Sequence, residues 1–413
     1  MEKMPYFGGA IINNQFMKYK NAYKTASFMM LFTFLSGTQL FAQKSLTVTV
    51  NNKLNFDRTE VVGVSKKSLA AFLKTNKEES IGVKNKATGK YETLQWIDND
   101  GDGVRDELLF VADVKAKSKA EYLLEDAKGN VVPATNVVAY SRFVPERTDD
   151  YTWENDKVAF RTYGPDAQQR TEQKRENGTL SSGIDLWLKR TPESVINKWY
   201  KGYQTDPMFY HKDRGEGYDP YHVGASRGTG GTGVWEKDSL LVSKNFVSYK
   251  TIAAGPLRTV FELTYAPYSD YEVKEVKRIS LDLGSNFSKF EVSYTAKKPL
   301  PNYATGITLH NNEGQAEVFA DKGIFVHNEK MDGTYIGEGI VMAPSIVQKA
   351  FVNKSKTKDQ SNLIILTNPA GKVTYYAGFA WEKAGQATNN TEWNALLNKQ
   401  AQVLASPLTV TVK

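Results

Sequence analysis

The sequence predicts an all-β protein in which a small N-terminal β-sandwich is followed by a large β-sandwich. Many segments alternate polar and apolar residues, and Phe290, Val292 and Tyr294 form one face of such a strand. These segments recur between turn residues, whereas helical periodicity is confined to a few short stretches. Aromatic residues make up 12% of the chain, and they favour strands.

The first 43 residues have the pattern of a cleavable signal peptide. Lys18, Lys20 and Lys24 precede an apolar stretch at residues 26–35, which small residues follow. The stretch is too short for a stable membrane anchor. We therefore expect export to the periplasm or the medium and no membrane insertion. The alternative is a buried N-terminal helix.

Composition excludes several classes of site and partner. The chain has no cysteine, which excludes disulfides, thiolate metal sites and cysteine nucleophiles. Its formal net charge is +7, of which +3 falls in the first 43 residues. The mild excess that remains suits an anionic substrate. No basic run with interleaved aromatics is present, so we expect no nucleic-acid partner.

Two domains follow the leader. We place a small β-domain at residues 44–137, where residues 45–50 alternate as a strand and residues 66–75 form a helix candidate. Residues 138–413 carry long strands with few helices and are expected to form the large sandwich. A helical stretch is expected within residues 382–406.

An acidic loop in the small domain has spacing typical of a calcium site. Gly103 stands at the sixth loop position, where a sharp turn is needed, but Leu109 replaces the usual glutamate at position twelve. The alternative is a hairpin turn with a solvated acidic tip. The candidate ligands are Asp98, Asp100, Asp102 and Asp106.

Residues 209–235 hold the densest group of reactive side chains. The segment is rich in glycine and contains two of the four histidines, whose imidazoles suit proton transfer near neutral pH. An ordered structural loop is the alternative. The candidate catalytic residues are Tyr210, His211, Glu216, Tyr218, Tyr221 and, at a predicted strand end, His310. We expect His327 to be structural.

A row of polar and aromatic side chains is predicted on neighbouring strands. Alternation places Arg161 with Tyr163, and Trp187 with Lys189, on shared faces, which suits the concave surface of a sugar-binding sandwich. A plain solvent face is the alternative. The candidate substrate-binding residues are Arg161, Tyr163, Trp187, Lys189, Asp213 and Arg227.

Five stretches together resemble a known bacterial family, a domain of unknown function with the number 4861. They span residues 98–110, 153–165, 183–190, 210–231 and 253–265. The resemblance covers essentially the whole mature chain. It implies an exported Bacteroidetes protein of polysaccharide degradation, similar to dehydratases of ulvan oligosaccharides. It also implies a fold similar to the super-β-sandwich of the sugar mutarotases.

We therefore expect a carbon–oxygen lyase, a dehydratase that removes water from uronic-acid-containing oligosaccharides. His211 is the expected base, a nearby tyrosine the acid, and Arg227 and Arg161 the carboxylate or sulfate ligands. We expect no cofactor in the chemistry and a structural calcium at most. The alternatives are a chain-cleaving lyase, a hydrolase using Asp213 and Glu216 as its carboxylate pair, and a non-catalytic glycan-binding protein. The oligomeric state is not predicted.

Overall fold

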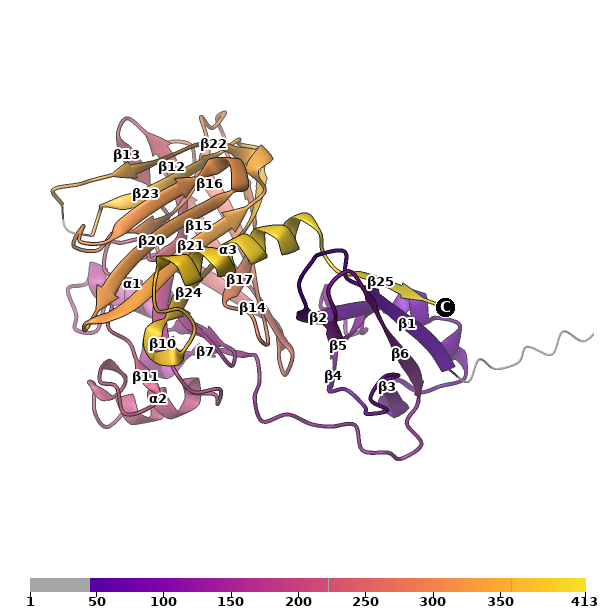
Figure 1. The fold of residues 1–413 in the computed structure, drawn as a ribbon. Coiled ribbons are helices and arrows are strands. Elements are labelled where there is room, and N and C mark those ends of the chain that lie inside the picture. Colours follow the sequence, from indigo (N-terminus) through magenta and orange to yellow (C-terminus); the bar gives the residue numbers. More distant parts are fainter. Residues whose placement is uncertain (1–44, 222, 358) are drawn as a thin grey trace, which may run out of the picture. The chain divides into compact units, whose positions relative to one another are not determined.

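A computed structural model describes residues 45–221, 223–357 and 359–413. The predicted signal peptide lies outside this range. The described residues cluster as one compact unit, and their strands all belong to antiparallel sheets (Figure 1). This confirms the predicted all-β class. Among the described residues no helix is long and apolar enough to cross a membrane.

The small domain is a sandwich of two sheets. Leu46, Val48 and Val50 alternate inward from the first sheet, and Phe110 and Ala112 face them from the second. The first sheet has the order β25-β1-β6-β3, with β1 (Ser45–Asn51), β3 (Ile81–Asn85), β6 (Lys119–Asp126) and β25 (Thr409–Val412). The second has the order β2-β5-β4, with β2 (Arg58–Ser65), β4 (Leu94–Ile97) and β5 (Glu107–Val114).

The helix expected at residues 66–75 is wrong. The chain forms two short 3-10 turns there, Lys66–Leu69 and Phe72–Lys74. Leu69 and Phe72 are nevertheless buried in the core of the small sandwich, as the pattern required. A spacing of three residues fits the 3-10 repeat as well as the α-helical one, so periodicity could not separate them.

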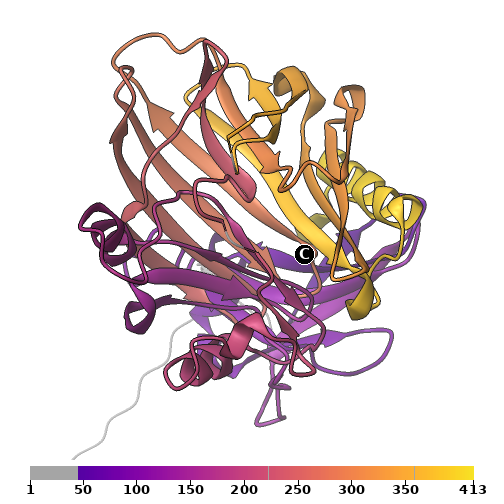
Figure 2. The ribbon, with the colours of Figure 1, turned by 90° about the vertical axis from the view of Figure 1, so that its left-hand side faces the viewer.

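The large sandwich consists of one eight-stranded sheet and two five-stranded sheets. The large sheet has the order β14-β15-β16-β17-β24-β21-β20-β19. Figure 2 shows β24 in yellow among the orange strands of that sheet. Its strands are β14 (Phe246–Ala254), β15 (Arg258–Tyr268), β16 (Val273–Asp282), β17 (Phe287–Thr295), β19 (Gln315–Phe319), β20 (Ile324–Met331), β21 (Thr334–Met342) and β24 (Lys372–Trp381).

The two smaller sheets share one core with the large sheet. Phe160 and Leu186 from one, and Ile307 and Leu363 from the other, belong to the same buried cluster as Phe325 of β20. The first sheet contains β7 (Tyr140–Val144), β8 (Asp150–Glu154), β9 (Ala159–Thr162), β10 (Asp185–Lys189) and β11 (Gly217–Tyr218). The second contains β12 (Thr229–Glu236), β13 (Ser239–Leu241), β18 (Tyr303–Thr308), β22 (Val347–Asn353) and β23 (Asn362–Thr367). The arrangement is the large super-β-sandwich that the sequence predicted.

Three α-helices occur in the described residues, α1 (Pro165–Glu172), α2 (Ile196–Tyr203) and α3 (Asn390–Ala405). Helix α3 confirms the helical stretch expected near the C-terminus, and Trp393 and Leu397 pack it on Val326 and Val341 of the large sheet (Figure 1). After α3, β25 pairs antiparallel with β1 of the small sandwich. The small sandwich thus includes the C-terminal strand, which lies outside the predicted range of residues 44–137.

Candidate functional site

A β-hairpin of the large sheet supplies the polar core of the candidate site. In β20, His327 and Glu329 share a face with Phe325, because successive strand residues alternate. Phe325 lies in the core between the sheets, whereas Val326 on the opposite face packs under α3. The hairpin register pairs His327 with Glu338 of β21. The hairpin therefore directs two acids and one histidine into the interior of the sandwich.

Two residues from other parts of the chain join this hairpin. His310 follows β18 and has a positive φ of 39°. Its Nδ1 lies 3.0 Å from Oε2 of Glu329. The Tyr221 ring stacks on His310 with centroids 4.6 Å apart, and its hydroxyl donates to Oε1 of Glu329 at 2.7 Å. Both carboxylate oxygens of Glu329 are thus engaged, one by each residue.

A second histidine–carboxylate pair lies beside the first. Nδ1 of His327 is 2.9 Å from Oε2 of Glu338, and the Thr229 hydroxyl donates to the other oxygen of Glu338 at 3.1 Å. The rings of His310 and His327 are 6.0 Å apart. We call Tyr221, His310, His327, Glu329 and Glu338 the histidine cluster.

The local electrostatics hold the His310–Glu329 pair in its charged form. Burial alone would lower the pKa of His310, but the hydrogen bond to Glu329 and the nearby carboxylate charges raise it above its usual value. Burial would raise the pKa of Glu329, and the bond and charge of His310 instead lower it. Burial and the charges of Glu329 and Glu338 raise the pKa of Tyr221 well above its usual range.

The histidine cluster opens onto a cavity of about 540 Å³. His310 and Glu329 line it, together with polar residues such as Asn328, Lys330 and Asn390. This volume falls in the range of small-molecule sites, roughly 300–1,000 Å³. On its other side His310 borders a narrow crevice shared with Tyr221 and Asp185. The cluster therefore has a solvent-connected side where a ligand can reach it.

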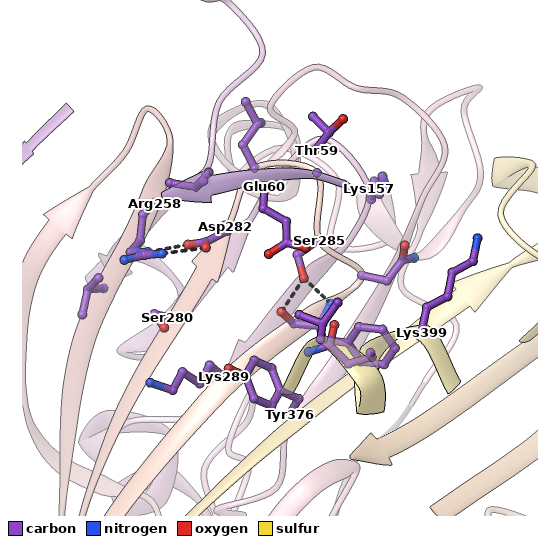
Figure 3. Close-up of a pocket in the computed structure, with 18 of the residues that line it drawn as sticks. Thr59, Glu60, Lys157, Arg258, Ser280, Asp282, Ser285, Lys289, Tyr376 and Lys399 are labelled. Carbon is purple, nitrogen blue, oxygen red and sulfur yellow. Dashed lines mark hydrogen bonds and ion pairs between the residues drawn. The ribbon is translucent and has the colours of Figure 1, made fainter. Parts of the chain in front are cut away.

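Another cavity, of about 460 Å³, lies over the outer side of strands β15 to β17 and differs in chemistry (Figure 3). Cations and acids line it, and Arg258 donates to Asp282 at 2.5 Å and 2.7 Å. Its described lining residues include no histidine. Tyr376 also lines it, and burial raises the pKa of that phenol to about 12. Histidine is the side chain most often used for proton transfer near neutral pH, so we place the candidate site at the histidine cluster.

The predicted substrate-binding row is buried, and the open concave face expected for it is wrong. Arg161 donates to Asp185 at 2.6 Å and to Asp219 at 2.7 Å. The prediction that Arg161 shares a face with Tyr163 is correct, because Arg161 donates to the Tyr163 hydroxyl. The Arg161 guanidinium also lies over the Trp187 ring. All of the following are at most 3% exposed: Arg161, Tyr163, Trp187, Lys189 and Arg227.

The row is buried because other elements cover it. Tyr200 of α2 and Tyr210 pack on Trp187 with ring centroids 5.3 Å and 5.1 Å away. Lys189 donates to Glu154 at 2.8 Å, and Arg227 donates to Ser182 at 2.7 Å. Arg161 and Lys189 are thus paired with carboxylates inside the protein, whereas Arg227 donates to neutral oxygens. A sugar cannot contact these three side chains without rearrangement.

The residues of the glycine-rich segment do not gather at one point. Nδ1 of His211 donates to the Asp219 carbonyl at 2.9 Å, and burial lowers the pKa of His211. The Tyr210 hydroxyl accepts from Arg161 at 3.1 Å, and Tyr218 bonds Asp332. Among the described residues of this segment, only Tyr221 belongs to the histidine cluster.

Two other carboxylates of the same segment are engaged nearer its surface. Asp213 pairs with Arg190 at 3.0 Å, and Glu216 pairs with Lys198 at 2.6 Å. Neither residue lines the cavity at the histidine cluster. The two do not face each other across that cavity as a hydrolase pair would.

The acidic loop between β4 and β5 brings three of its four predicted ligands together. Carboxylate oxygens of Asp98, Asp100 and Asp106 lie within 4.8 Å of one another. Asp98 also accepts from the amides of Gly101 and Gly103. Asp102 instead accepts from the amide of Val104 at 2.7 Å.

Sequence reasoning missed His327, Glu329 and Glu338 and assigned His327 a structural role. The signal was present in the sequence. Asp332-Gly333 is a strong two-residue hairpin turn between alternating strands. That turn fixes a register in which His327 faces Glu338, and alternation adds Glu329 to the same face.

The fold and the cluster define a super-β-sandwich protein with a histidine- and glutamate-lined cavity. The chain belongs to the family described as Domain of unknown function (DUF4861), which it matches over residues 50–410. It is 41% identical over 373 residues to Uncharacterized protein P7 of Formosa agariphila, covering 89% of this chain and 93% of that protein. The expected family membership is thereby confirmed.

Two solved structures show more distant similarity. One is a protein in the Glycosyl Hydrolase Family 38 from Enterococcus faecalis, with a TM-score of 0.49, 10% identity and coverage of 90% of this chain and 48% of that one. The other is an alpha-mannosidase from Enterococcus faecalis V583, with a TM-score of 0.44, 10% identity and coverage of 90% and 46%. This chain spans about half the length of either structure. At this similarity neither bears on activity.

Proposed function

We propose that this protein is a carbon–oxygen lyase that eliminates water from uronic-acid-containing oligosaccharides, such as those of ulvan-like sulfated polysaccharides. The observation that carries the proposal is that His310 and Glu329 line a cavity of about 540 Å³. Tyr221 contacts both of them from the crevice on the other side of His310. Elimination beside a carboxylate needs a positive charge for that carboxylate and a group that moves a proton. The three residues offer both.

The positive charge in this proposal is the imidazolium of His310. Its raised pKa keeps it protonated to a higher pH than a free histidine. It lines the cavity, so a bound uronate can place its carboxylate there. Neutralising that carboxylate makes the proton on C5 more acidic, because the carbanion charge spreads into it.

Tyr221 carries the proton in this proposal. Its hydroxyl proton moves to Oε1 of Glu329, 2.7 Å away, while the phenol oxygen takes the proton from C5. The C–H electron pair forms the new C=C bond as the C–O bond β to the carboxylate breaks. The phenol then protonates the leaving oxygen, which departs as water, and Glu329 returns the first proton to Tyr221. Protons and electrons balance, and both residues are restored.

The alternative activities differ in what leaves. A chain-cleaving lyase uses the same proton abstraction but expels a sugar, and the cluster serves it equally. A hydrolase built on Asp213 and Glu216 is less favoured, because Arg190 and Lys198 hold these carboxylates outside the cavity. A binding protein needs aromatic platforms but no proton-transfer cluster.

Mass spectrometry of uronate oligosaccharides incubated with the purified mature chain tests the proposal. Loss of one water with chain length retained is the expected result. Shorter products would replace the dehydratase with a chain-cleaving enzyme. Unchanged masses across several uronate-containing glycans, together with measurable binding, would instead favour a glycan-binding protein.

The proposal includes export through the signal peptide of residues 1–43. A substrate of extracellular origin suits a protein outside the cytoplasm. N-terminal sequencing of the protein from a periplasmic extract should begin near residue 44. A cytoplasmic protein with its leader intact would contradict it.

A further inference from the structure

His327 belongs to the histidine cluster but takes no part in the proposed elimination, and it carries an unexplained feature. Its side chain is 1% exposed, and Nδ1 is held by Glu338. Its Nε2 is buried and has no hydrogen-bond partner among the residues that the structure describes. A buried polar atom without a partner costs about 1–3 kcal/mol, so a native protein retains one where something else satisfies it.

We propose that His310, His327 and Glu329 bind a divalent first-row transition-metal ion. One ligand atom from each of the three residues lies within 4.8 Å of the other two. Two imidazoles and one carboxylate form a common donor set for such ions, with open positions left for water or substrate. The inference goes beyond the proposed elimination and stands independently of it.

The spacing of the donors suits one ion. Ligand atoms about 2.1 Å from a tetrahedral ion lie about 3.4 Å from each other. Nδ1 of His310 and Oε2 of Glu329 are 3.0 Å apart, so this pair already has nearly the required separation. The Tyr221 hydroxyl bonds only the other oxygen of Glu329. An ion on Oε2 therefore leaves the contact with Tyr221 in place.

Contacts with Glu338 orient His327 for this role. Metal-bound histidines usually present their other ring nitrogen to a carboxylate, which fixes the tautomer and raises the basicity of the ligating nitrogen. Glu338 makes this contact with Nδ1, and Thr229 in turn donates to Glu338. The proton is thereby directed to Nδ1, and the lone pair is left on Nε2.

Gly314 places no side chain against that nitrogen. A Cβ at position 314 would lie 2.3 Å from Nε2 of His327, close to the roughly 2.0–2.1 Å of a zinc–nitrogen bond. Any side chain would therefore compete with an ion for this nitrogen. The backbone passes beside the imidazole without blocking it because residue 314 is a glycine.

The ion would face the cavity where His310 and Glu329 are exposed to ligand. There it would take over from the His310 proton as the positive charge that meets a carboxylate or another anionic oxygen. This differs from the acidic loop, whose hard carboxylate oxygens suit calcium. The sequence pattern led us to expect no cofactor in the chemistry, and the inference departs from that expectation.

Zinc uptake by the mature chain tests the inference. The chain is stripped with a chelator, supplied with excess calcium to occupy the acidic loop, and titrated with Zn²⁺ against a chromophoric competitor. Bound zinc is counted by mass spectrometry of the metal after gel filtration. The variants are His310→Gln, His327→Gln and Glu338→Gln, and His211→Gln is the matched control because His211 lies outside the cluster.

The expected result is one zinc ion per wild-type chain and per His211→Gln chain. Glu338→Gln, which only orients His327, should weaken binding about 10–100-fold, and loss of either histidine ligand should weaken it further. If His327→Gln does not fold, His310→Gln decides, because His310 is partly exposed at the cavity. Wild-type chain without bound zinc, or His310→Gln with wild-type affinity, would overturn the inference.

The two proposals fail separately. Zinc uptake is measured without substrate, so a chain that binds zinc but eliminates nothing contradicts the lyase alone. A chain that eliminates water and takes up no zinc contradicts the metal site alone.

Discussion

Replacing Tyr221 with phenylalanine tests the proposed proton path with little change in shape. The ring can keep its stack on His310 at 4.6 Å, and only the hydroxyl that donates to Glu329 at 2.7 Å is lost. Glu329 retains its contact with His310. The expected cost to the free energy of unfolding is therefore about 1–3 kcal/mol, the price of one buried acceptor left without its donor.

The effect on turnover should be much larger. A positioned proton-transfer group contributes about 100- to 10,000-fold in rate, and Tyr221 performs both transfers in the proposed path. The turnover number of Tyr221→Phe should fall by at least about 100-fold. The assay follows the ultraviolet absorbance of the new C=C bond and confirms loss of water by mass spectrometry.

Tyr91→Phe is the matched control. Tyr91 also donates to a glutamate, Glu125, at 2.8 Å, but in the small sandwich. Its loss should leave turnover within about twofold of wild type, because surface changes away from a site act weakly. Wild-type turnover in a folded Tyr221→Phe chain would refute the path. If His211→Ala abolished turnover in its place, the base would be His211, as the sequence pattern first suggested.

Three further predictions concern stability. Arg161→Met leaves Asp185 and Asp219 buried without their cation, and denaturant unfolding should show that the free energy of unfolding falls by about 3–5 kcal/mol. Arg214→Met removes an exposed ion pair and should cost at most about 1 kcal/mol. An unchanged free energy of unfolding in Arg161→Met, together with weaker substrate binding, would instead identify Arg161 as a substrate ligand. We propose that the acidic loop binds calcium. Calcium at 100 times its Kd should then stabilise the wild-type chain by about 2.7 kcal/mol and should not stabilise Asp98→Asn. Equal melting temperatures of the wild type with and without calcium would show that the loop is a hairpin turn with a solvated acidic tip. Burial lowers the folded-state pKa of His211 below the usual histidine value of about 6.5, so the unfolded chain binds the proton more readily and stability decreases as the pH falls below that value. In His211→Gln this part of the loss should disappear from melting curves between pH 7.5 and 5, and the same pH dependence in both chains would contradict it.

Local pattern was sufficient for much of the fold. Alternation such as Phe290-Val292-Tyr294 predicts strands, because a residue pair two apart always shares a face. The stripe that contains Trp393 and Leu397 predicts α3, which is buried on the large sheet at those positions. Both inferences need only neighbours in sequence. The α-helix predicted at residues 66–75 is wrong because the spacing of its apolar residues fits a 3-10 helix as well as an α-helix.

The predicted substrate-binding row shows what alternation along a strand cannot predict. Alternation correctly placed Arg161 on one face with Tyr163. It could not show that α2 and Tyr210 lie over that face. A strand pattern shows which side chains share a face, but it does not show what packs on that face.

The sequence by itself determined the class of fold, the family and two members of the histidine cluster, Tyr221 and His310. It also contained the hairpin that pairs His327 with Glu338, because a two-residue turn fixes the register of its strands. Only the tertiary structure decided that these groups meet. Tyr221 follows one sheet, His310 follows a strand of another, and Glu329 lies on a third. Contacts between sheets depend on how whole layers pack, and no short-range periodicity encodes that distance.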